Sequence, residues 1–327
     1  MFRIGNFEFD NKAILAPMAG ITSFGYRKFM EQFSYAYSVT EMVSAVGLLY
    51  GNKETQEYIS FKKGSYPTCV QLFGSDPESI AKAGVLALSK NSNIDFFDIN
   101  MGCPVNKVTK TGAGSALMKD SELCGEIVKK LKEATKKPVT AKIRLGWDDK
   151  SINYEEVIFS LENAGVDAIA IHARTCKELY SGKPHFEMLK DLKDKMCVPL
   201  IISGNISTLE DAINALEITK ADAVMVARGG IGNPFLLKQI NTYYQTGEKL
   251  ECPSLKEQLQ YCRDLAKHYI SEKGEERAMR LFRGIAPKFF SGLPNSKDIR
   301  VKLSTKLETY DSLNEILKEI EDTFIIS

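Results

Sequence analysis

Short runs of apolar, strand-forming residues recur between residues 13 and 227, and helical segments separate most of them. Alternating strands and helices build a parallel sheet, because each helix returns the chain across the sheet. Eight such units predict an α/β protein with a (β/α)8 TIM barrel over residues 1–245. The eight runs are 13–16, 35–39, 68–73, 95–100, 139–144, 167–172, 199–203 and 222–227.

An open, doubly wound sheet is the alternative fold. No GxGxxG motif follows the first run, which argues against a dinucleotide-binding sheet. Ser207 and Glu210 have the spacing of a capping box and predict the start of one helix. Asn233 and Pro234 predict the N-cap and first turn of another. The predicted helices lie at 77–90, 121–135, 154–164 and 208–218.

After residue 245 the strand pattern stops, and residues 243–254 have the composition of a linker. A helical pattern begins at Ser254, so we expect a small helical domain over residues 246–327. From Arg277 to Lys306 there are eight basic residues and one acid, Asp298. This charge suits a nucleic-acid backbone, whereas the alternative is an ordinary solvated helical face.

The 327 residues carry a net charge of +1, which by itself favours no polyanionic partner. Seven cysteines form no CxxC pair, so the sequence predicts neither a zinc site nor a disulfide framework. No apolar run approaches the length that spans a membrane. We therefore expect a soluble cytoplasmic protein, without bound metal, that acts as a monomer.

Cys103 lies in a loop just after the fourth predicted strand. Met101-Gly102-Cys103-Pro104 ends that strand, because proline cannot continue a central strand. Gly112 and Gly114 follow before Ala116, which with Gly102 is typical of a loop that packs closely against a ligand or another backbone. Cys103 is therefore a candidate reactive thiol, although most cysteines are buried structural residues.

Polar residues stand at the ends of most predicted strands, where enzymes of this fold place their chemistry. The alternation of side chains along a strand directs Gln71, Asn100, Lys142 and His172 towards the barrel interior together. Burying such groups is costly without partners, and a bound polar ligand would supply them. For each residue alone, a core or surface role is the alternative.

The loops after the last two strands read SGNIS and ARGGIGNP. Glycines there let backbone N–H groups approach an anion, and Arg228 adds positive charge. Because barrels of this type commonly bind phosphate at these loops, we expect a phosphate-bearing cofactor with an uncharged ring system. Gln71 and Lys142 would contact the ring.

These motifs resemble the bacterial tRNA-dihydrouridine synthase family. They occur in the order typical of that family and cover the whole barrel, whereas RLFRG and SGLP in the tail resemble its second domain more loosely. The matching stretches are LAPMAGIT (15–22), VQLFGSDP (70–77), DINMGCPVNKV (98–108), GAGSALM (112–118), AKIRLGW (141–147), IHARTCKELYSGKP (171–184), SGNI (203–206) and ARGGIGNP (227–234).

The resemblance implies an FMN-dependent enzyme that reduces uridines in tRNA to 5,6-dihydrouridine with NADPH. It makes Cys103 the catalytic proton donor and the helical domain a tRNA-binding platform. The implied substrate contacts are Asn100, Arg144, Arg174 and Tyr180. The implied flavin contacts are Pro17, Met18, Ala19, Gln71, Lys142, His172, Ser203, Gly204, Asn205, Ala227 and Arg228.

The chain departs from the family pattern at three places. Ser203 stands where the family often has Asn, and Ala227 where it often has Gly. The histidine expected just after Arg283 is absent, and Gly284 follows instead. Ser203 and Ala227 are both small, so backbone contacts with a phosphate could survive. The missing histidine bears on the contacts of the tail and on the choice of tRNA position, not on the chemistry.

Three rival functions stay open at this point. The nearest is an FMN barrel reductase that acts on a free pyrimidine, similar to dihydroorotate dehydrogenase. A lyase or aldolase barrel could use Lys142 as a Schiff base. A non-catalytic RNA-binding protein would bind tRNA without any turnover. The basic tail argues against the first, because an enzyme acting on a small molecule has no need of it.

Overall fold

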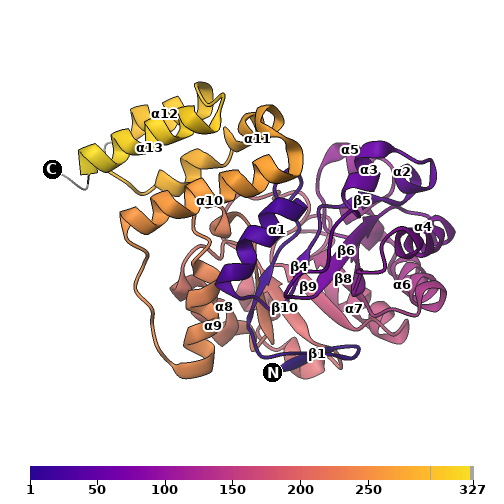
Figure 1. The fold of residues 1–327 in the computed structure, drawn as a ribbon. Coiled ribbons are helices and arrows are strands. Elements are labelled where there is room, and N and C mark those ends of the chain that lie inside the picture. Colours follow the sequence, from indigo (N-terminus) through magenta and orange to yellow (C-terminus); the bar gives the residue numbers. More distant parts are fainter. Residues whose placement is uncertain (295, 325–327) are drawn as a thin grey trace.

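The computed structural model describes residues 1–294 and 296–324. Its centre is a barrel of parallel strands surrounded by helices (Figure 1). Each of the eight predicted runs contains a strand of this barrel. The strands are β3 (Ala13–Leu15), β4 (Ser38–Val39), β6 (Thr68–Phe73), β7 (Phe96–Asn100), β8 (Val139–Arg144), β9 (Ala168–His172), β10 (Leu200–Ser203) and β11 (Ala223–Val226).

The barrel closes where its last strand meets its first. β11 pairs in parallel with β3, with Val224 opposite Ala13, and β4 pairs with both β3 and β6. A short strand, β5 (Val43–Ser44), continues the course of β4 after residues 40–42 and also pairs with β6. The predicted TIM barrel is therefore confirmed, and all its strand ends face one side of the molecule.

Helices cover the outside of the barrel, and some of them start at a residue whose side chain caps a backbone N–H group. Asp76 caps α4, whose first residue is Pro77, and Asp120 caps α6. The helices of the barrel are α1 (Phe24–Met30), α2 (Ala45–Leu49), α3 (Lys53–Glu57), α4 (Pro77–Lys90), α5 (Asn106–Thr109), α6 (Ser121–Thr135), α7 (Tyr154–Asn163), α8 (Leu209–Thr219) and α9 (Leu236–Thr246).

Two predicted helix starts are wrong by one or two residues. The capping box of α8 joins Thr208 to Asp211, not Ser207 to Glu210, because the Asp211 carboxylate accepts from the Thr208 N–H. Asn233 and Pro234 form a turn, and α9 begins at Leu236. At α8 the neighbouring Ser207 and Thr208 are both residue types that cap helices, whereas α9 begins without a side-chain cap.

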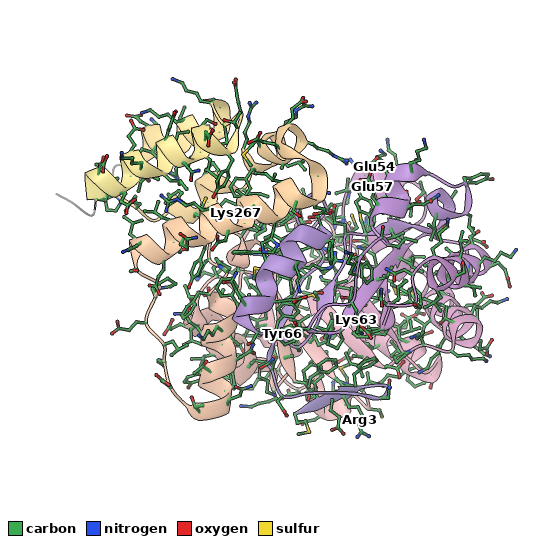
Figure 2. All side chains as sticks on the ribbon, in the orientation of Figure 1. Arg3, Glu54, Glu57, Lys63, Tyr66 and Lys267 are labelled. Carbon is green, nitrogen blue, oxygen red and sulfur yellow. The ribbon has the colours of Figure 1, made fainter. Side chains whose placement is uncertain are left out.

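An N-terminal hairpin that the sequence analysis did not predict closes the far end of the barrel. Its strands are β1 (Phe2–Ile4) and β2 (Phe7–Phe9). Phe2 and Phe9 stack with ring centroids 5.0 Å apart and join the apolar cluster inside the barrel. Arg3 on this hairpin and Glu57 on α3 mark opposite ends of the molecule in Figure 2.

The C-terminal helices pack on α1, beside the barrel (Figure 1). They are α10 (Leu255–Lys273), α11 (Glu275–Phe282), α12 (Lys297–Thr305) and α13 (Tyr310–Phe324). Residues 247–254 connect them to α9, so the predicted linker starts four residues too early. Because apolar side chains of α1 and α10 share one core, the division into domains 1–245 and 246–327 stays a prediction. Residues 325–327 of the second predicted domain lie outside the described part of the chain.

The Tyr269 hydroxyl of α10 donates to the Ile21 carbonyl at 2.8 Å. The Glu272 carboxylate of α10 accepts from the Ser23 hydroxyl and the Gly25 N–H, each at 2.7 Å. The C-terminal helices therefore hold the loop that leaves β3. No helix within residues 1–294 and 296–324 is long and apolar enough to span a membrane.

Candidate active site

A cavity of about 740 Å³ opens among the loops at the carboxyl ends of the strands. Every one of the sixteen residues predicted for the site lines it. Predicted cofactor contacts, substrate contacts and the thiol therefore belong to one chamber. These residues are Pro17, Met18, Ala19, Gln71, Asn100, Cys103, Lys142, Arg144, His172, Arg174, Tyr180, Ser203, Gly204, Asn205, Ala227 and Arg228.

A chain of hydrogen bonds runs along the floor of the cavity from a buried carboxylate to the cysteine loop. The Gln71 amide donates to Asp98 Oδ2 at 2.7 Å, and Thr140 donates to Asp98 Oδ1 at 2.6 Å. The Asn100 amide donates to Gln71 Oε1 at 2.8 Å, and Asn100 Oδ1 accepts from the Cys103 N–H at 2.9 Å. Asp98 thus fixes the orientation of both amides.

Lys142 is the cation at the floor. Its ammonium makes no hydrogen bond or ion pair with any described residue. Burial and, to a smaller extent, the neighbouring Arg144 lower the pKa of Lys142 to about 8, against the opposite effect of Asp98. Burial likewise raises the pKa of Asp98 to about 6. An unpaired, partly desolvated ammonium is costly, so a ligand with negative character would stabilise it.

His172 is neutral because of its surroundings. The Arg174 guanidinium lies 3.0 Å from His172 Nε2 and can only donate, so Nε2 accepts and Nδ1 carries the proton. Burial and the nearby cations lower the pKa of His172 to about 2. The imidazole can therefore offer an N–H donor to a ligand, but not a charge that changes near neutral pH.

Arg144 ties two loops around the cavity mouth. Its guanidinium donates to the Gly102 carbonyl at 2.8 Å, and to the Thr175 and Leu179 carbonyls at 2.6 and 2.8 Å. Gly102 precedes the cysteine, and the other two residues follow β9. Arg144 is buried, so this predicted substrate contact also has a structural role.

Cys103 is half-buried on the cavity wall. Its carbonyl accepts from the Ser115 N–H at 3.0 Å, and a Cβ on Gly114 would lie 2.7 Å from that carbonyl. Gly114 is therefore required for the close approach of the two loop segments. Burial raises the pKa of the Cys103 thiol above its usual range. A thiol that keeps its proton at neutral pH is suited to act as an acid.

The loops after β10 and β11 form the predicted anion site. Gly204 and Asn205 both have positive φ, and a Cβ on Gly229 would lie 2.0 Å from the Ile206 carbonyl. The two loops therefore pack backbone against backbone. The Arg228 guanidinium lies 4.7 Å from the centroid of the Tyr180 ring, which holds its charge at the cavity.

The lining carries five cationic side chains and, among the described residues, no carboxylate. The sequence analysis missed Met42, which comes from the interruption between β4 and β5, and Lys288, which comes from the C-terminal helices. Neither stands at a strand end, so strand periodicity could not indicate them. The others missed are Ala16, Ile21, Gly102, Val105, Ile206, Ser207, Met225, Gly229 and Ile231.

Three of the eight basic residues between Arg277 and Lys306 form ion pairs, and a fourth donates to a backbone carbonyl. Arg277 forms an ion pair with Glu57 at 3.2 Å, and Arg280 with Glu276 at 2.7 Å. Figure 2 shows Glu57 on α3, on the side of the barrel that faces the C-terminal helices. Lys302 pairs with a glutamate of α13, and Arg283 donates to a backbone carbonyl. The eight bases therefore do not form the unshielded cluster that their order in the sequence suggested.

Within the part of the chain that the structure describes, no group of histidine, cysteine and acidic side chains could hold a metal ion.

A family model described as dihydrouridine synthase matches residues 14–324. The chain belongs to the dihydrouridine synthase family. It is 34% identical over 301 residues to the probable tRNA-dihydrouridine synthase of Rickettsia bellii, covering 92% of both chains. It is 33% identical over 311 residues to tRNA-dihydrouridine synthase B of Pseudomonas aeruginosa, covering 94% of this chain and 92% of that protein. The predicted family, and with it an enzyme of an oxidoreductase class, is confirmed.

Solved structures show the same barrel at low sequence identity. A 2-naphthoyl-CoA reductase complex has a TM-score of 0.53 and 14% identity over 73% of this chain and 51% of that one. A 6-hydroxypseudooxynicotine amine oxidase from Pseudomonas geniculata has a TM-score of 0.52 and 12% identity over 76% of this chain and 52% of that one. This chain spans about half of each, and the likeness concerns the fold alone.

Proposed function

We propose that this protein reduces specific uridines in tRNA to 5,6-dihydrouridine, with FMN as cofactor and NADPH as electron donor. Family membership supports the reaction class. The observation that carries the proposal is a single cavity that holds both an unpaired Lys142 and a protonated Cys103. Lys142 suits the negatively charged edge of a reduced ring system, and Cys103 suits the delivery of a proton.

The residues present fit FMN. Lys142 and the remaining N–H of the Gln71 amide would hold the heteroatoms of its ring, and His172 would donate from Nδ1. Arg228 and the backbone of the loops after β10 and β11 would hold its phosphate. Pro17, Met18, Ala19, Ser203, Gly204, Asn205 and Ala227 would complete the contacts. When bound, the flavin supplies the hydride that it receives from NADPH.

Cys103 is the proposed proton donor. Its thiol would protonate C5 of the uracil ring while C6 receives the hydride from the opposite face. Because the cysteine is half-buried rather than sealed, solvent can restore its proton. Asn100, Arg144, Arg174 and Tyr180 would hold the uridine and nearby phosphates, since they line the same cavity.

The substrate must leave its stack to reach this cavity. Extruding a nucleotide costs a few kcal/mol, which contacts with the RNA backbone would offset. We propose that a monomer binds tRNA in the cytoplasm, and that the helical residues 246–327 contribute to this binding as a second domain. Five of the eight bases of the tail have no ion pair among the described residues: Arg283, which donates to a backbone carbonyl, and Lys288, Lys297, Arg300 and Lys306. They support a smaller contribution than all eight bases would make.

The test is mass spectrometry of unmodified tRNA after incubation with the purified protein and NADPH, read fragment by fragment. A gain of two hydrogens at one or a few uridines supports the proposal and identifies the positions. Free uridine and a free pyrimidine base serve as parallel substrates. Reduction of the free base without any gain in tRNA would instead identify a reductase for free pyrimidines.

A further inference from the structure

The single tryptophan of the chain lies between two lysine side chains at the rim of the barrel. Lys119 Nζ is 3.6 Å from the centroid of the Trp147 ring, and Lys177 Nζ is 5.6 Å from it. Trp147 follows β8, Lys177 follows β9, and Lys119 ends a 3-10 helix, Gly114–Lys119, that follows β7. Three loops at the carboxyl ends of neighbouring strands therefore bring two ammonium groups onto one indole.

Neither ammonium group has a carboxylate partner in the described ranges. The acids adjacent in sequence to the three residues are engaged elsewhere. Asp120 Oδ1 accepts from the Leu123 N–H, and Asp148 Oδ1 accepts from the Ser151 hydroxyl. Glu178 accepts from the Thr175 N–H and lies 2.6 Å from His185 Nε2. Lys177 contributes to the lowered pKa of Asp148 without forming an ion pair. Two cations that share one ring repel each other, and a polyanion would relieve that repulsion.

This cluster adjoins the mouth of the cavity. The Lys177 N–H donates to the Trp147 carbonyl at 3.0 Å, and the Cys176 N–H donates to the Gly146 carbonyl at 2.9 Å. Two residues further along, Leu179 is half-exposed, and next to it Tyr180 lines the cavity. The 3-10 helix that ends at Lys119 also carries Ser115, whose N–H holds the Cys103 loop.

We propose that Trp147, Lys119 and Lys177 form a docking surface for the phosphate backbone of tRNA next to the uridine in the cavity. An ammonium group recognises phosphate as a point charge, and the indole holds both groups in place before binding. Two exposed lysines extend the positive charge: Lys107 of α5, which contacts the same 3-10 helix, and Lys110, which follows α5. The surface orients the RNA and does not read its bases. This inference rests on tRNA being the substrate.

The test measures the affinity of the complete protein for tRNA across a range of salt concentrations. Each phosphate contact contributes about 0.7 to 0.9 to the slope of log K against log salt. The double variant K119M/K177M should therefore lower that slope by about 1.5. The charge-preserving K119R/K177R should keep the slope of the parent protein. The single variants K119M and K177M should each lower the slope by about half as much as the double variant does.

The matched control is K136M/K220M, which removes the same charge at the other end of the barrel. Both lysines are exposed, have left-handed backbone conformation, and end a helix just before β8 and β11. This control should leave the slope unchanged.

A K119M/K177M slope equal to that of the parent protein, or equal losses in K119M/K177M and the control, would overturn the inference. If the parent protein neither binds nor modifies tRNA, the proposed function itself fails. If the parent protein modifies tRNA while the rim variants keep its slope, only the docking surface fails.

Discussion

The basic residues of the C-terminal helices and the lysines of the barrel rim differ in their surroundings more than in their number. Those of the tail are dense in the sequence, yet Arg277, Arg280 and Lys302 each meet a glutamate. Lys119 and Lys177 lie 58 residues apart in the chain and meet one indole and no carboxylate partner among the described residues. Density of charge in a sequence therefore does not measure the charge that a ligand meets, because neutralising partners can come from other elements, as Glu57 of α3 does for Arg277.

The largest effect should come from the cavity at the strand ends, since the two basic regions are proposed to bind RNA and not to take part in the chemistry. Cys103→Ala should lower dihydrouridine formation at least about 100-fold, because general acid catalysis contributes that much or more. The measurement is single-turnover formation of dihydrouridine at saturating tRNA. Cys176→Ala is the control, a nearby buried thiol that does not line the cavity. A Cys103→Ala rate near that of the parent protein would remove the proton-donor role.

The second effect concerns Lys142, which belongs to neither basic region. Because the pKa of Lys142 is about 8, flavin affinity should fall above about pH 8 as the ammonium group loses its proton. The fall should approach tenfold per pH unit, measured by flavin fluorescence between pH 6 and 9.5. The Lys142→Met variant should bind flavin more weakly, and its affinity should not fall in this way as the pH rises. His172, with a pKa of about 2, cannot produce it.

Lys142 also makes stability depend on pH in the flavin-free protein. Its pKa is 10.5 in a free side chain and about 8 in the fold, so the unfolded chain holds more protons between these values. Stability should therefore rise as the pH increases from about 8 towards 10.5. Denaturant titrations of the parent protein and Lys142→Met give the difference, and parallel curves would contradict the lowered pKa.

The third effect tests whether the C-terminal helices support the wall of the cavity. Tyr269→Phe removes the hydrogen bond to the Ile21 carbonyl and should lower the free energy of unfolding by about 1 kcal/mol. Tyr261→Phe is the control, because the Tyr261 hydroxyl makes no hydrogen bond within the described residues. Equal stability of the two variants would show that α10 does not hold the loop after β3 through this contact.

The smallest effect should come from the paired bases of the tail. R280M/K302M removes as much charge as K119M/K177M, but its cations are already neutralised by glutamates. Its salt slope for tRNA should change by less than about 0.5, and its affinity by less than about twofold. If R280M/K302M lowered the salt slope as much as K119M/K177M does, the paired bases of the tail would contact tRNA as strongly as the rim lysines. That result would contradict the comparison.

The sequence predicted the barrel and the lining residues because a parallel barrel brings every strand end to one side. Strand periodicity and the order of the strands were enough to predict that Gln71, Asn100 and Lys142 point into the barrel. Lys288 reaches the cavity through tertiary packing of the tail, which no local pattern encodes. The start of α8 was misplaced because adjacent residues can cap equally well.

The absorption spectrum of the purified protein tests the central claim most directly, since every proposed step depends on a flavin in this cavity. The account predicts visible flavin bands, loss of those bands on adding NADPH, and FMN as the released compound in mass spectrometry. In Lys142→Met the bands should weaken. A colourless protein that takes up no added FMN would contradict the account, whatever its affinity for tRNA.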